Sequence, residues 1–146
     1  MENIKKRTGT KKKARKIILI VLSVLILIYV ILNIIFWYKG APERFFKYDI
    51  TENGSVEVKC CSAPFFLLNV PDTIGGKPVT SIDRIFGNSL LDDGKYNFMK
   101  HYVMAVRIPD TVEEIHFCAF EDCTNLRMIN MPKSLKYTGG HILTNT

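Results

Sequence analysis

The chain has 146 residues, 47% of them hydrophobic, and a formal net charge of +6. Eight of its twenty Lys and Arg residues precede Ile17, where only Glu2 opposes them, and the remainder holds twelve basic and thirteen acidic side chains. The chain beyond the tail is therefore nearly neutral, which excludes a generally basic nucleic-acid-binding protein.

The basic tail comprises residues 1–16, with its charges between Lys5 and Lys16. A nucleic-acid or heparin patch is one interpretation of such a cluster. The tail contains no aromatic side chain that could stack on a base, and it is followed directly by an apolar run. Attraction to anionic lipid headgroups is the interpretation that its position favours, and no nucleic-acid partner is expected.

Residues 17–38 carry no charge, and their clearly polar members are Ser23 and Asn33. As a helix these residues would measure about 33 Å, enough to cross a hydrocarbon core of about 30 Å. A cleaved signal peptide would have a shorter apolar region and small residues where Trp37 and Tyr38 stand. The sequence predicts an uncleaved single-pass anchor in the cell membrane, with a cytoplasmic N-terminus and an extracytoplasmic C-terminal domain.

Gly40-Ala41-Pro42 is expected to end the helix. The linker, residues 39–44, would reach only about 20 Å when extended, so the domain at residues 45–146 should lie close to the membrane. Residues 45–50 and 56–60 are predicted to form a β-hairpin, in which Asn53-Gly54 supplies the positive φ angles of a tight turn. Asn53-Gly54-Ser55 also fits a glycosylation acceptor, but the turn explains the same residues.

A repeat occupies most of the remaining chain. Val103-x-x-Val106-x-Ile108-Pro109 is followed, twenty-three positions later, by Leu126-x-x-Ile129-x-Met131-Pro132, and an interrupted copy starts at Phe65. A fixed period of this kind predicts a solenoid, in which the apolar triplets stack beneath short parallel strands. Val112, Ile115, Ala119 and Phe120 should return the chain along the convex side. The insertion at residues 75–78 is expected to form a loop.

The segment Ile108-Pro109-Asp110-Thr111-Val112, with Ile115, Ala119-Phe120 and Cys123-x-x-Leu126, resembles the BspA-type leucine-rich repeats of bacterial surface proteins. The resemblance covers about Tyr48 to the C-terminus. It implies an α/β-type short leucine-rich repeat solenoid of about three repeats, with an irregular or short-helical convex side. The third repeat departs from the pattern, because Thr138 replaces Ile and His141-Ile142-Leu143 replaces Ala-Phe.

Side chains alternate along a strand, so the positions between the triplet residues should project from the concave face. This face is the natural docking surface of a solenoid, although it could also be only a solvated sheet face. The long insertion from Leu90 to Tyr102 adds two aromatic side chains that could contact a partner or cover the core. The candidate partner-binding residues are Leu67, Asn69, Ala105, Arg107, Arg127, Met128, Asn130, Tyr96 and Phe98.

Other chemistry has weaker support. Asp92-Asp93-Gly94 is better explained by a turn than by a calcium site. Four cysteines fall in the domain; Cys123 matches a core position of the family, and pairing of Cys60 or Cys61 with Cys118 stays open. No cysteine or histidine pair has the close spacing of a zinc site.

The sequence contains no motif of a hydrolase, phosphate-binding loop or zinc protease, so neither enzymatic activity nor a cofactor is expected. Two functions remain. One is a membrane-anchored module that binds a protein or glycan outside the cell. The other is an accessory subunit of a membrane complex that acts through its transmembrane helix and basic tail, with the repeats as a structural element.

Overall fold

The computed structural model describes residues 2–86 and 99–146 of the protein, with side chains from Lys12 onward in the first segment. The described chain divides into two compact units, one that ends at Leu32 and one that begins at Asn33. Tyr96 and Phe98, two of the predicted partner-binding residues, lie outside the described residues, as does Asp92-Asp93-Gly94, for which a turn was predicted.

The first unit is helical. Helix α1 spans Glu2–Lys39, and the apolar side chains from Ile17 to Leu32 are exposed. In the described part of the chain, Lys12–Lys39 is the one helix whose length and composition would allow it to cross a membrane. These properties fit a membrane anchor and also a signal sequence near the N-terminus.

The second unit begins with the end of α1 and a short 3₁₀ helix, η1 (Glu43–Phe45), followed by the predicted hairpin. Strands β1 (Phe46–Ile50) and β2 (Val56–Cys61) are antiparallel, with Ile50 opposite Val56. In the connecting loop Gly54 has a φ of +78°, but Asn53 has no positive φ. The prediction of two positive φ angles was therefore wrong: the Thr51 N–H donates to the Ser55 carbonyl (2.9 Å), which closes a longer loop.

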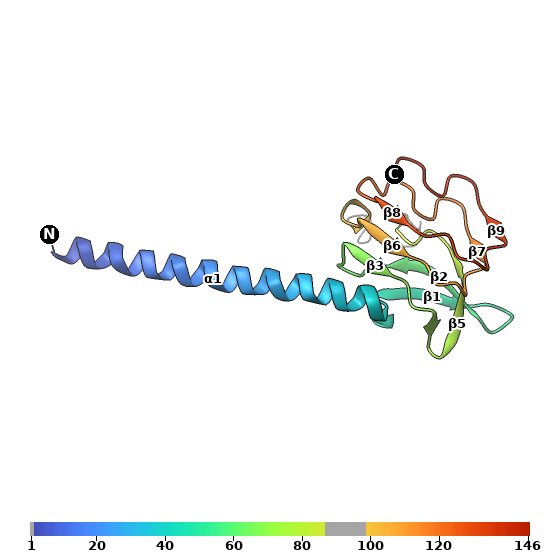
Figure 1. Ribbon diagram of the computed structural model, residues 1–146, viewed down its shortest axis with the longest axis horizontal. Coiled ribbons are helices and arrows are strands. Elements are labelled where there is room, and N and C mark those ends of the chain that lie inside the picture. Colours follow the sequence, from blue (N-terminus) through green and yellow to red (C-terminus); the bar gives the residue numbers. More distant parts are fainter. Residues whose placement is uncertain (1, 87–98) are drawn as a thin grey trace. The chain divides into compact units, whose positions relative to one another are not determined.

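Two sheets of short strands enclose the core (Figure 1). The concave sheet consists of β3 (Leu67–Asn69), β6 (Ala105–Arg107) and β8 (Met128–Ile129), all parallel. In the other sheet β2 is followed by β5 (Lys77–Ile82), β7 (Glu114–Ile115) and β9 (Tyr137–Thr138), also parallel. The parallel solenoid is confirmed, and its convex side carries short strands. A second 3₁₀ helix, η2 (Met99–His101), precedes β6.

The insertion before β5 is more regular than the predicted loop. Strand β4 (Thr73–Ile74) pairs with the start of β5, and the two residues that connect them, Gly75 and Gly76, have φ angles of +59° and +73°. Two successive positive φ angles match the turn that suits the twist of a β-hairpin, and glycine adopts them without strain.

The core follows the predicted periodicity in the first two repeats. The triplets that begin at Phe65 and Val103 are buried, and so are Val112, Ile115, Ala119 and Phe120 on the convex side. In the third repeat Leu126 is buried, Ile129 only partly, and Met131 is 49% exposed. Met131 was therefore wrongly predicted to face inward; within the described chain no further repeat packs against the third one.

Candidate partner-binding groove

The register of the concave sheet aligns its side chains in rows. Leu67 pairs with Ala105, which pairs with Met128, while Asn69 pairs with Arg107. Cross-strand neighbours in a parallel sheet lie about 4.8 Å apart, so the row that begins at Leu67 is a continuous strip across the three repeats.

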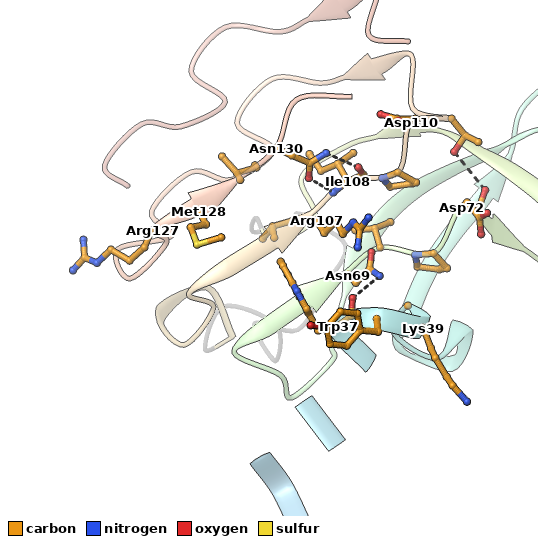
Figure 2. A pocket seen from close by; sticks show the side chains of 18 residues that line it. Trp37, Lys39, Asn69, Asp72, Arg107, Ile108, Asp110, Arg127, Met128 and Asn130 are labelled. Atoms are coloured by element: carbon orange, nitrogen blue, oxygen red, sulfur yellow. Dashed lines mark hydrogen bonds between the residues drawn. The ribbon is translucent and has the colours of Figure 1, made fainter. Parts of the chain in front are cut away.

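A groove with a volume of about 1160 Å³ lies over this sheet (Figure 2). Its walls come from three parts of the second unit: the end of α1, the ends of β3 and β6 with the turns that follow them, and β8. The side chains that define its character are Trp37, Lys39, Asn69, Asp72, Arg107, Asp110, Arg127, Met128 and Asn130.

The structure brings five of the predicted residues to this groove: Asn69, Arg107, Arg127, Met128 and Asn130. Met128 is 62% exposed, so its side chain offers an accessible apolar surface in the groove. Leu67 is only half-buried and does not line the groove. Ala105 is buried, 4% exposed, because its small side chain lies between larger neighbours; its predicted direct contact with a partner is not supported by this burial.

The two asparagines stabilise the groove itself. Asn130 Nδ2 donates to the Ile108 carbonyl (2.8 Å), and the Ile108 N–H donates to Asn130 Oδ1 (2.7 Å). These bonds continue the ladder past Ile129, where β8 ends (Figure 2). Asn69 Nδ2 donates to the Trp37 carbonyl (2.9 Å). Because both amides already bond the backbone, these side chains position the groove walls more than they offer free groups to a partner.

Charges are placed unevenly along the groove. Asp72 and Asp110 follow β3 and β6, and the Lys133 N–H donates to Asp110 Oδ1 (3.0 Å). This backbone hydrogen bond, with the nearby charges of Lys133 and Arg107, lowers the pKa of Asp110 below its usual 3.8. Arg127 extends away from the other labelled side chains, whereas Arg107 lies among them (Figure 2). Arg107 is thus the central cation of the groove.

Sequence reasoning missed the contribution of the helix end. Trp37 and Tyr38 were predicted to end the membrane anchor and Lys39 to begin the linker, yet all three line the groove. The signal that points to this role is Asn33, a polar residue in an apolar run, which is completely buried in the second unit. Asn33 Oδ1 accepts the Phe66 N–H (3.0 Å), which joins the helix end to the start of β3.

A second, smaller groove on the convex side holds a histidine near a serine and two glutamates. His116 Nε2 lies 2.9 Å from Ser81 Oγ, 3.5 Å from Glu57 Oε1 and 3.7 Å from Glu114 Oε2. In a catalytic triad the serine and the carboxylate bind opposite nitrogens of the imidazole. Here all three groups approach the same nitrogen, so the arrangement is not a triad.

The cysteines are free thiols in the structure, and all four are buried. The open pairing of Cys60 or Cys61 with Cys118 is therefore not formed. Burial raises the pKa of the Cys61 and Cys123 thiols to about 12, so both are protonated at neutral pH and behave as small apolar core residues. Across residues 12–86 and 99–146, no group of three or more His, Cys, Asp or Glu side chains could hold a metal ion.

Comparison with known proteins agrees with this architecture. Residues 93–146 match the sequence model of the family described as BspA type leucine rich repeat region. The crystal structure of a leucine-rich repeat protein from T. pallidum resembles this fold with a TM-score of 0.63 at 24% identity, over 73% of this chain and 46% of that one. A leucine-rich repeat protein from Bacteroides ovatus shares 30% identity over 62% of this chain and 23% of its own, with a TM-score of 0.40.

No match was found among curated proteins. This chain spans less than half the length of the T. pallidum structure, and at this level of identity the likeness concerns the fold alone. The family match and the structural likeness both concern the repeats, and together they agree with the triplets, the proline-ended strands and the buried convex residues seen here. The repeats within residues 93–146 match the BspA type of leucine-rich repeat.

Proposed function

We propose that the chain is a membrane-anchored module that binds a protein outside the cell, close to the membrane, through the concave groove. Leucine-rich repeat modules of this kind generally bind proteins and are generally not enzymes. The observation that carries the proposal is the groove itself, which Trp37, Arg107 and Met128 line together over the concave sheet. Aromatic and arginine side chains are the commonest energetic anchors of protein interfaces.

The choice of a protein over a glycan rests on this mixture of side chains. Met128 offers a large, exposed apolar surface, and Arg107 offers a planar guanidinium that can bind a carboxylate with two hydrogen bonds. Besides aromatic surfaces, glycan recognition needs polar side chains that are free to meet hydroxyl groups, but the amides of Asn69 and Asn130 already bond the backbone. An extended, partly acidic protein segment is therefore the partner that fits best.

Membrane anchoring is supported by the length and composition of the helix and by the basic residues before it. The excess of Lys and Arg on the N-terminal side favours a cytoplasmic tail and an exported C-terminal domain. The tail would also attract anionic headgroups of the inner leaflet.

The test is site-specific photo-crosslinking in the native cell with the full chain. A photoreactive residue at Met128 should give one discrete protein adduct, while the same residue at Tyr137, which is 56% exposed on the other sheet, should not. Arg107→Glu should abolish the adduct, whereas Arg84→Glu, which changes an exposed arginine outside the groove, should leave it intact.

The same experiment addresses the second function. Replacement of residues 17–32 by an unrelated spanning sequence should leave the Met128 adduct unchanged if the groove captures the partner. Loss of the adduct in this variant, together with no effect of Arg107→Glu, would instead support an accessory subunit that acts through its helix.

A further inference from the structure

The end of α1 runs alongside β3 in the same direction. Asn33 Oδ1 accepts the Phe66 N–H (3.0 Å) at the start of β3, and the Ala41 N–H donates to the Asn69 carbonyl (2.8 Å) at its end. About eight residues of mostly helical chain cover about 12 Å, and the three steps from Phe66 to Asn69 cover about 10 Å, so the two segments match in length. The helix therefore enters the domain beside the start of β3.

The other two concave strands start at this same end, because β3, β6 and β8 are parallel. Backbone hydrogen bonds form a continuous row here: the Met104 N–H donates to the Phe66 carbonyl (2.7 Å), and the Arg127 N–H donates to the Met104 carbonyl (2.8 Å). Tyr102 lies just before this row in the second repeat. We call Phe66, Tyr102, Met104 and Arg127 the junction rim.

The junction rim differs chemically from the opposite end of the strands. Tyr102 is 51% exposed, Met104 is 49% exposed, and the Arg127 side chain is exposed as well. The opposite end carries the exposed carboxylates of Asp72 and Asp110. Exposed aromatic and apolar side chains beside an arginine suit the interface between lipid and water, where anionic headgroups attract the cation.

The length of the anchor brings this rim toward the lipid. The exposed apolar side chains of α1 run from Ile17 to Ile35, and these nineteen residues measure about 28 Å as a helix. This length nearly matches a hydrocarbon core of about 30 Å, so the outer edge of the core should lie close to Ile35. Asn33, two residues earlier, accepts the Phe66 N–H, so the end of the domain that holds Asn33 should lie at the level of the headgroups.

We propose that the junction rim rests on the outer lipid surface at the level of the headgroups. The groove, which lies beyond the rim, is then held at a fixed distance from the membrane, where a partner can reach it. This inference rests on the proposed membrane anchoring. The rim is a lipid contact, whereas Arg107 and Met128 remain available for a protein.

The test uses two methionines of the unmodified chain. Met104 and Met131 are both 49% exposed, but Met104 belongs to the junction rim and Met131 follows β8 at the opposite end. The full chain is reconstituted in vesicles of phosphatidylcholine and phosphatidylglycerol and treated with a charged, membrane-impermeant oxidant. We expect sulfoxide to form at Met104 at least about threefold more slowly than at Met131; equal rates would overturn the proposal.

A second measurement tests the lipid contact of the rim independently of the membrane anchoring of the helix. Trp37 is the one tryptophan of the chain, so Trp37→Phe gives a background for single reporters at Leu25, Met104 and Met131. In vesicles with brominated acyl chains, Leu25→Trp should be quenched strongly, Met104→Trp partly and Met131→Trp not at all. An unquenched Leu25→Trp would refute membrane anchoring. Quenching of Leu25→Trp with equal signals from the other two reporters would refute only the lipid contact of the rim.

Discussion

Gly139 lies where the third repeat crosses the backbone of the second. Its N–H donates to the Ile115 carbonyl (2.7 Å), and a Cβ at this position would overlap the Phe117 nitrogen and lie 2.8 Å from the His116 carbonyl carbon. These are backbone atoms, so they cannot rotate away as a side chain would.

We expect Gly139→Ala to lower the free energy of unfolding by about 1–3 kcal/mol, the usual cost of forcing extra volume into a packed site. Gly140→Ala is the matched control, because its Cβ would lie 3.5 Å from the Phe117 ring, an ordinary contact. Chemical denaturation of both variants provides the measurement. Equal stability of the two would mean that the close approach at Gly139 relaxes easily.

Asp122 ties the last residues of the chain to the second repeat. Asn145 Nδ2 donates to Asp122 Oδ1 (3.1 Å), and Lys100 Nζ donates to Asp122 Oδ2 (3.0 Å). Both hydrogen bonds lower the pKa of Asp122 below 3.8, and the bond from Asn145 has the larger effect. A carboxyl whose pKa is lower in the folded state contributes stability above its unfolded pKa, and the contribution is lost as the pH falls through the folded pKa.

Residues 141–146 should therefore exchange their amide hydrogens faster once the pH falls below about 3.8, before the buried core strands do so. Corrected for intrinsic rates, hydrogen exchange followed by mass spectrometry measures this opening. Asp122→Asn should remove most of the pH dependence of this segment, whereas Asp49→Asn on β1 should not. Opening of the segment and the core at one common pH would contradict this account.

At the scale of elements, the end of α1 serves as the N-terminal cap of the concave sheet. Asn33 bonds the Phe66 N–H, and the Phe36 and Phe65 rings lie 4.9 Å apart. An uncapped sheet edge exposes unpaired backbone groups and invites association with other strands. The last residues of α1, from Asn33 to Lys39, therefore have two roles: they extend the apolar helix, and they close one end of the solenoid.

Replacement of Asn33 by leucine separates these two roles. Asn33→Leu makes the helix more apolar but removes the acceptor of the part-buried Phe66 N–H, so the repeats should lose about 1–3 kcal/mol of stability while the chain remains in the membrane. The control is Ser23→Leu, since the Ser23 hydroxyl bonds only its own helix at Ile20 (2.8 Å). Thermal unfolding of the β-structure in detergent would show the difference; an unchanged midpoint for Asn33→Leu would argue against the cap.

For the whole molecule, the division at Asn33 predicts where the repeat domain can be separated from the helix. A fragment that begins at Asn33 keeps the contacts of the helix end with Phe65, Phe66 and the Asn69 side chain, while one that begins at Gly40 loses these and keeps the bond from the Ala41 N–H to the Asn69 carbonyl. We expect the shorter fragment to unfold at a temperature several degrees lower or to aggregate through β3. Calorimetry and light scattering on the two fragments test this, and equal behaviour would place the domain boundary at Gly40 instead.

Much of the fold could be predicted from residue spacing. The inward triplets of the first two repeats, the parallel strands, the hairpin before them and the buried convex residues follow from apolar periodicity, which burial imposes on every unit. The apolar spacing wrongly predicted that Met131 is buried, because burial at this position depends on a neighbouring repeat. Prediction from the sequence also failed at Asn53, because the loop length and not the Asn-Gly pair set the turn type.

The candidate site was predictable only in part. Arg107 and Met128 were found because strand alternation fixes which side chains project. Asn69 and Asn130 were also placed correctly on the groove, but their bonds to Trp37 and Ile108 join segments about thirty and twenty residues apart, which no local pattern reveals.

By itself, the sequence determined the repeat, its period, the apolar helix and the uneven charge, because each of these is a property of local residue order. Tertiary structure alone decided that Asn33 is a buried cap, that Trp37 forms part of a groove wall, and that the first concave strand runs beside the end of the helix. The physical reason is that hydrogen-bond partners and burial depend on which segments fold together, and a residue's neighbours in the chain do not specify its neighbours in space.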